Sequence, residues 1–127
     1  MDAIARWHDY VERRDPALLE ALIADGAVFQ SPAVHKPQEG KAVTIKYLSA
    51  AMTVLGTESF RYLEEWIGET SAVLEFEAEV HGLTVNGVDM IWWDGAGRIT
   101  RFKVMVRPLR ALHAVIERMR AELMRAG

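Results

Sequence analysis

The sequence predicts one α+β domain in which helices cover the concave face of a curved antiparallel sheet. First, apolar residues recur at helical spacing near both ends of the chain, as in Ile4, Trp7 and Val11. Second, Glu alternates with apolar residues along residues 73–80, which indicates a strand with one wet and one buried face. Third, no repeat or linker interrupts the 127 residues, so residues 1–127 are expected to form a single domain.

Two helices are expected at the start of the chain. Asp2 is positioned to cap the first helix. Asp15 caps the second, with Pro16 in its first turn, where a missing N–H is harmless. Residues 24–26 are expected to end this second helix.

A short strand over residues 27–31 is expected to stop at Pro32. The segment 32–39 contains two prolines and no periodicity, so it is read as a loop. A third helix is expected from Gly40 to Gly56.

Long strands are expected at residues 58–67, 71–81, 84–93 and 98–107, with a tight turn at residues 94–97 before the last. Pro108 opens a final helix. Strands of this length twist strongly, and helices across the concave side enclose an apolar pocket.

Composition narrows the possible partners. The net charge of −3 argues against nucleic acid, which requires a concentrated basic surface. The absence of cysteine removes disulfides and thiolate chemistry. No secretory signal and no apolar run long enough to cross a bilayer is visible, so a cytoplasmic protein is expected.

No cofactor or metal is expected. The four histidines lack an i, i+4 pair and have no Cys companions. The glycines at 95 and 97 join two strands and do not open a helix, so they form no phosphate loop.

Two stretches carry a family resemblance. They are residues 24–32 (ADGAVFQSP), followed after a loop by residues 39–43 (EGKAV), and residues 87–99 (GVDMIWWDGAGRI). Together they resemble the nuclear transport factor 2-like superfamily, and most closely its SnoaL-like branch of polyketide cyclases, steroid isomerases and relatives of unknown activity. The resemblance implies a cone-shaped α+β barrel and a homodimer formed through the outer sheet face. This scaffold hosts many unrelated roles.

The ketosteroid isomerases of this superfamily provide a test of mechanism. Their general base, just before a proline in the first strand, falls on Ser31, which cannot act as a carboxylate. Their oxyanion-hole tyrosine falls on Trp7, and their protonated aspartic acid falls on Asp89. A steroid-isomerase mechanism in that form is therefore not expected.

Asp89 is also the leading candidate from the residues alone. Alternation places it on one face of its strand with Ile91 and Trp93. If that face is the inner one, burial would raise the pKa of the carboxyl and suit it to acid–base work. The structural alternative is a carboxyl that only bonds a neighbour and orders the sheet.

Three further polar residues are candidate partners of Asp89. His35 in the loop could exchange protons, or be an exposed loop residue. Tyr10 could direct its hydroxyl at a ligand, or close the edge of the core. Ser31 could hydrogen-bond a ligand or the backbone, and no nucleophile elbow surrounds it.

Aromatic and apolar residues are expected to line the pocket and the core: Trp7, Phe29, Phe60, Trp66, Leu74, Phe76, Trp93 and Phe102. On the opposite sheet face, Met90, Trp92 and Met105 indicate an interface between two copies of the chain, unless the last helix covers them.

Three functions remain open. The first is a cofactor-independent isomerase, cyclase or dehydratase that uses Asp89 on a small hydrophobic substrate. The second is a non-catalytic domain that binds a small apolar ligand. The third is a dimeric module that binds other proteins.

Overall fold

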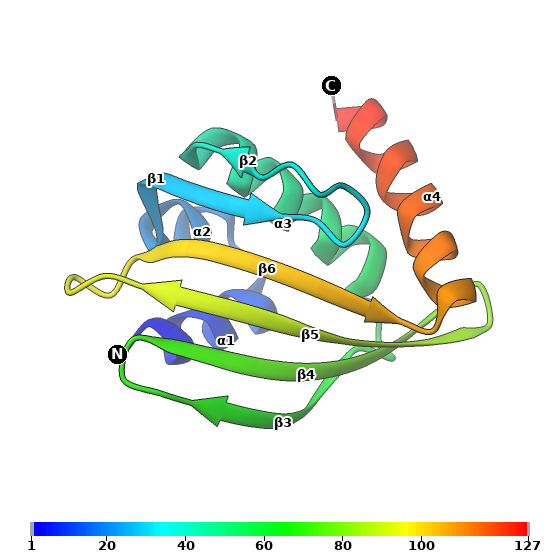
Figure 1. Ribbon diagram of the computed structural model, residues 1–127, viewed down its shortest axis with the longest axis horizontal. Helices are drawn as coiled ribbons and strands as arrows, with labels where there is room; N and C mark the ends of the chain where they lie inside the picture. Colours follow the sequence, from blue (N-terminus) through cyan, green and yellow to red (C-terminus); the bar gives the residue numbers. More distant parts are fainter. Residues whose placement is uncertain (1, 127) are drawn as a thin grey trace.

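The computed structural model describes residues 2–126, which form four helices and six strands (Figure 1). In chain order these are α1 (Ala3–Arg13), α2 (Pro16–Leu22), β1 (Ile23–Gln30), β2 (Gln38–Glu39), α3 (Lys41–Leu55), β3 (Arg61–Ile67), β4 (Ser71–Val80), β5 (Leu83–Trp93), β6 (Ile99–Arg107) and α4 (Leu109–Ala126). No helix in this part of the chain has the length and apolar character needed to cross a membrane.

Both predicted aspartate caps are confirmed. Asp2 accepts a hydrogen bond from the Ala5 N–H at 2.8 Å, and Asp15 accepts one from the Ala17 N–H at 3.0 Å. These bonds satisfy backbone donors that a helix start leaves free.

The predicted boundary between α2 and β1 is wrong by several residues. The chain becomes extended at Ile23, and residues 24–26 belong to the strand. They form an irregularity, because the pairing of β1 with β6 shifts register between Ile23 and Val28. The predicted loop also contains the short strand β2, whose Gln38 and Glu39 pair with β1.

The six strands form one sheet in the order β2-β1-β6-β5-β4-β3. The α+β class and the curved, helix-covered sheet are confirmed. The sheet is mixed, however, and not wholly antiparallel: β1 runs parallel to β6, whereas the other neighbours are antiparallel.

Helices α1, α2 and α3 lie behind the sheet in Figure 1, and α4 lies at the end where β6 finishes. The sheet therefore has an inner face toward the helices and an outer face away from them. On β5 the residues alternate between the two, with Val85, Gly87, Asp89 and Ile91 buried. The inner face and the helices enclose the core, whose largest fully buried side chains are Trp7, Phe29, Phe76 and Phe102.

Candidate functional site

Asp89 lies on the inner face, in the middle of β5. The register places it between Leu74 of β4 and Val104 of β6. Its side chain is 6% exposed, and no other acidic residue among those described is buried. A carboxyl surrounded by apolar neighbours has to be hydrogen-bonded or neutral to be tolerated there.

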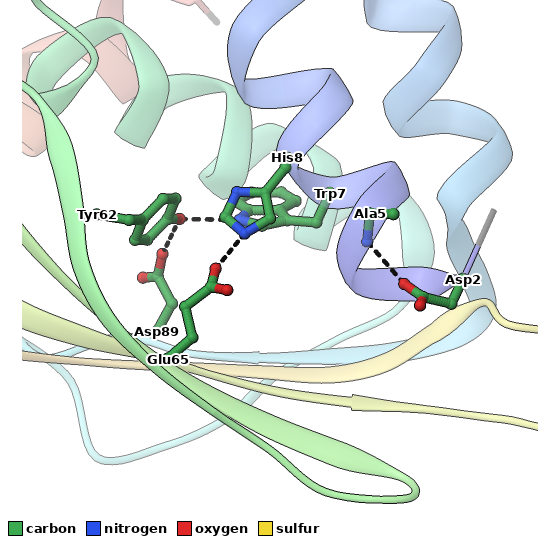
Figure 2. Close-up of polar contacts among 7 residues, drawn as sticks. All are labelled: Asp2, Ala5, Trp7, His8, Tyr62, Glu65 and Asp89. Atoms are coloured by element: carbon green, nitrogen blue, oxygen red, sulfur yellow. Dashed lines mark hydrogen bonds and ion pairs between the residues drawn. The ribbon is translucent and has the colours of Figure 1, made fainter.

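The partner of Asp89 is Tyr62, on the edge strand β3. Its hydroxyl donates to Asp89 Oδ2 at 2.6 Å, and its oxygen accepts a hydrogen bond from Trp7 Nε1 at 2.8 Å (Figure 2). The indole nitrogen can only donate. The direction of the chain of hydrogen bonds is therefore fixed, from Trp7 through Tyr62 to the carboxyl.

Burial dominates the acid–base properties of this pair. Desolvation raises the pKa of Asp89 from 3.8 to about 7, although the Tyr62 hydrogen bond acts in the opposite direction. Desolvation and then the nearby Asp89 charge raise the pKa of Tyr62 well above its usual value. Tyr62 therefore stays protonated at neutral pH, whereas Asp89 is close to the midpoint of its titration.

A second polar pair borders the first. The imidazole of His8 contacts the carboxylate of Glu65 from β3 (Figure 2). The His8 ring also meets the Tyr62 ring edge-on, with the ring centroids 5.2 Å apart. Both side chains of the pair are about one third exposed, so this contact lies at the surface and not in the core.

A bulge in β3 explains why Glu65 points inward. Tyr62 pairs with Phe76 and Glu65 pairs with Leu74, so β3 has one residue more than β4 over this interval. The extra residue reverses the alternation. The expectation that Trp66 lines the pocket is wrong for this reason: its side chain lies on the outer face and is 54% exposed.

A small cavity borders the Asp89 carboxyl. Its volume is about 30 Å³, room for about one water molecule. We call this space the inner cavity; it is lined by Trp7, Leu48, Ala51, Met52, Leu55, Phe60, Phe76, Asp89, Phe102 and Val104.

A larger apolar groove lies between α3, α4, β6 and the loop after β1. Its volume is about 260 Å³. Ala51, Leu55 and Val104 line both this groove and the inner cavity, so these three side chains separate the two spaces.

The aromatic residues expected at the pocket lie in four different places. Four line the inner cavity, and Phe29 lines the groove. Trp93 packs against the core but borders neither space. Trp66 lies outside, as described above.

The expected polar partners do not meet Asp89. Ser31 lines the groove, where its oxygen accepts a hydrogen bond from the Ala33 N–H at 2.9 Å. His35 is exposed and borders a separate hollow beside Lys103. Tyr10 is buried against Trp7, with the ring centroids 5.5 Å apart, and burial raises the pKa of its hydroxyl.

Tyr62, His8 and Glu65 were not predicted as site residues from the sequence. The spacing of Phe60 and Tyr62 in a predicted strand was a signal for two aromatics on one face, but it did not say which strand would lie beside Asp89. Within residues 2–126, no three His, Asp or Glu side chains gather closely enough to hold a metal ion.

The chain is similar to known proteins over most of its length. A family model described as the SnoaL-like domain matches residues 4–102. The crystal structure of a steroid delta-isomerase from Pseudomonas aeruginosa is 40% identical, with a TM-score of 0.92 over 98% of this chain and 90% of that one. An uncharacterised protein with a cystatin-like fold from Silicibacter pomeroyi is 31% identical, with a TM-score of 0.87 over 96% and 85%. No curated protein matches the chain.

Proposed function

Because this chain belongs to the family of SnoaL-like domains, we propose that it binds a small apolar molecule and moves a proton on it with the Asp89 carboxyl, as a cofactor-independent isomerase or a related cyclase or dehydratase. One observation carries the proposal: the only buried acid among the described residues is held by Tyr62 at the wall of the inner cavity. The 40% identity to a steroid delta-isomerase supports the isomerase class.

A single carboxyl near the midpoint of its titration suffices for an isomerisation. The carboxylate removes a proton from a carbon beside a carbonyl, and the C–H electrons pass into an enolate. The neutral acid then returns the proton to a different carbon, so a double bond moves and no atom or electron is gained or lost. A pKa of about 7 makes both forms of Asp89 available at neutral pH.

The hydrogen bonds indicate which oxygen exchanges the proton. Tyr62 donates to Oδ2 and receives from Trp7, so Oδ2 accepts a hydrogen bond in both protonation states. Oδ1 is therefore the oxygen that gains and loses the proton. Tyr62 acts as a positioning residue for the carboxyl, and Trp7 positions Tyr62 in turn.

Because residue 31 is a serine, Asp89 has no second carboxyl to share the proton transfer with. Ser31 stands where the ketosteroid isomerases have their base, and its hydroxyl lines the groove. In this proposal Ser31 binds the ligand, and Asp89 both removes and returns the proton.

Substrate access requires side-chain movement. An inner cavity of about 30 Å³ is too small for an organic substrate. The groove is the nearest larger space, and Leu55 is one of the side chains between them. In this proposal, a ligand in the groove displaces Leu55 and reaches Asp89.

The test is an isomerisation assay on wild type and two matched variants. A Δ5-3-ketosteroid and a smaller β,γ-unsaturated ketone are suitable substrates, because conjugation of the double bond produces ultraviolet absorbance. Asp89→Asn should lower kcat at least about 100-fold. Asp25→Asn, at an exposed carboxylate, should leave kcat unchanged. An Asp89→Asn protein that turns over at the wild-type rate would exclude the acid–base role.

The second candidate is a binding domain without catalysis. The small volume beside Asp89, about 30 Å³, leaves little room for a substrate to react there and favours this alternative. Native mass spectrometry of freshly purified protein would detect a retained apolar ligand. A ligand that binds the groove unchanged, with no turnover in wild type, would favour this function over the isomerase.

We also propose that two copies associate through the outer face. Met105 is 51% exposed there, close to Met90 and Trp92 on the neighbouring strand. The face is self-complementary in charge, because β4 carries Glu75 and Glu77 whereas β6 carries basic residues. A two-fold axis along β5 would place β4 of each copy opposite β6 of the other.

A further inference from the structure

The groove contains one charged side chain. Of the sixteen residues that line it, Arg120 of α4 alone has a charge. The remaining lining is apolar except for Ser31 and Tyr47. A single cation in an otherwise apolar groove favours a ligand with a long apolar part and one anionic group.

Arg120 is available to bind such a group. It is exposed, and none of the ion pairs among residues 2–126 includes it. On the same helix, by contrast, Arg125 pairs with Glu122. A guanidinium presents a planar pair of donors that matches the two oxygens of a carboxylate.

Arg120 and Asp89 border two adjacent spaces that share three lining side chains. Arg120 borders the groove but not the inner cavity, and Asp89 borders the inner cavity but not the groove. The apolar side chains that line both spaces lie between them. A ligand held at one end by its charge would thus extend toward the carboxyl with its apolar part.

We infer that the ligand is an apolar carboxylic acid, whose carboxylate binds Arg120 while its apolar part fills the groove toward Asp89. The position of the reacting end at Asp89 rests on the proposed function; the binding of the carboxylate at Arg120 does not. The groove, at about 260 Å³, has the volume of roughly nine water molecules. An acid of about ten carbon atoms therefore suits it.

The experiment compares decanoate with 1-decanol, which has the same chain and no charge. Binding to the full chain is measured by calorimetry at pH 8 and low salt, with both ligands below their aggregation limits. The variants are Arg120→Gln and, as a matched control, Arg110→Gln, an exposed arginine of α4 outside the groove. Circular dichroism confirms that each variant is folded.

Arg120→Gln should weaken decanoate binding about tenfold and leave decanol binding unchanged. Arg110→Gln should affect neither ligand. The inference is overturned if decanoate binds no better than decanol to wild type, or if Arg110→Gln weakens decanoate as much as Arg120→Gln does. Asp89→Asn should still bind decanoate, so a failure of the catalytic proposal is distinguishable from a failure of this one.

Discussion

The phenolic oxygen of Tyr62 lies 2.6 Å from Asp89 Oδ2, and this hydrogen bond joins the edge strand β3 to the centre of the sheet. It crosses above β4, which separates the two strands. The bond holds a carboxyl that burial would otherwise leave without a donor, and it opposes the rise in the pKa of Asp89. The packing of β3 against the rest of the sheet and the pKa of Asp89 therefore depend on the same contact.

The first prediction concerns stability against pH. The unfolded chain loses the Asp89 proton near pH 4, whereas the native chain keeps it until about pH 7. Between these values the native state binds more protons, so stability falls as pH rises. Above pH 7 the effect levels off. Relative to Asp89→Asn, wild type should lose up to about 4 kcal/mol of unfolding free energy from pH 4 to pH 8.

Urea unfolding of both proteins across this pH range measures the difference in their free energies of unfolding. The contributions of the other titrating groups are the same in both proteins and cancel in this difference. Asn keeps the shape of the side chain and has no charge to bury. Parallel curves for the two proteins would show that Asp89 titrates at an ordinary pKa in the native state.

The second prediction concerns Tyr62→Phe. Loss of the hydroxyl removes the hydrogen bond that lowers the pKa of Asp89, so this pKa should rise further. It also leaves the Trp7 N–H without its acceptor. The expected destabilisation is about 1–3 kcal/mol, and the alkaline shift is measurable in a pH–rate profile or by carboxyl infrared absorption. Tyr47→Phe, in the groove, is the control and should not move the profile.

Regular alternation along β5 was enough to place Asp89 on the same face as Ile91, but it left open whether that face was the inner one. Each residue of this strand from Val85 to Ile91 lies on the face that a period of two assigns to it. Family resemblance and alternation agree at this position. The order of the long strands followed from the same kind of pattern, together with the turn at residues 94–97.

The surroundings of Asp89 could not be predicted in the same way. The β3 bulge reverses alternation after Tyr62, and it depends on pairing with β4, which the β3 sequence alone does not specify. Trp66 was misplaced for this reason. Tyr62 was missed because its contact with Asp89 spans a strand and depends on how tightly the sheet curves.

The third prediction concerns Gly87, on the inner face beside Phe76. A Cβ at this position would lie 2.5 Å from the Phe76 ring and 2.6 Å from the Met105 carbonyl oxygen. The carbonyl belongs to a paired strand and cannot move freely. Gly87→Ala should therefore destabilise the protein by about 1–3 kcal/mol, measured by thermal or urea unfolding. Gly95→Ala is the control, because nothing lies within 4 Å of its added Cβ.

The fourth prediction concerns the His8–Glu65 pair. Both side chains are about one third exposed, so solvent and salt screen their attraction. A double-mutant cycle with His8→Ala and Glu65→Ala should give a coupling of less than about 1 kcal/mol, which decreases in high salt. A larger coupling that does not depend on salt would indicate that the pair positions Tyr62 and is not a surface contact alone.

The fifth prediction tests the outer face. Met105→Glu places a charge at a half-exposed position of the proposed interface, opposite the acidic strand β4 of the other copy. Burial of an unpaired charge costs several kcal/mol, so the dimer should dissociate to monomers. Light scattering during gel filtration measures the mass directly. Leu109→Glu, at a 66% exposed position on α4, is the matched control and should remain dimeric. A wild-type protein that is monomeric at high micromolar concentration would refute the interface, because two copies would then not associate through any face.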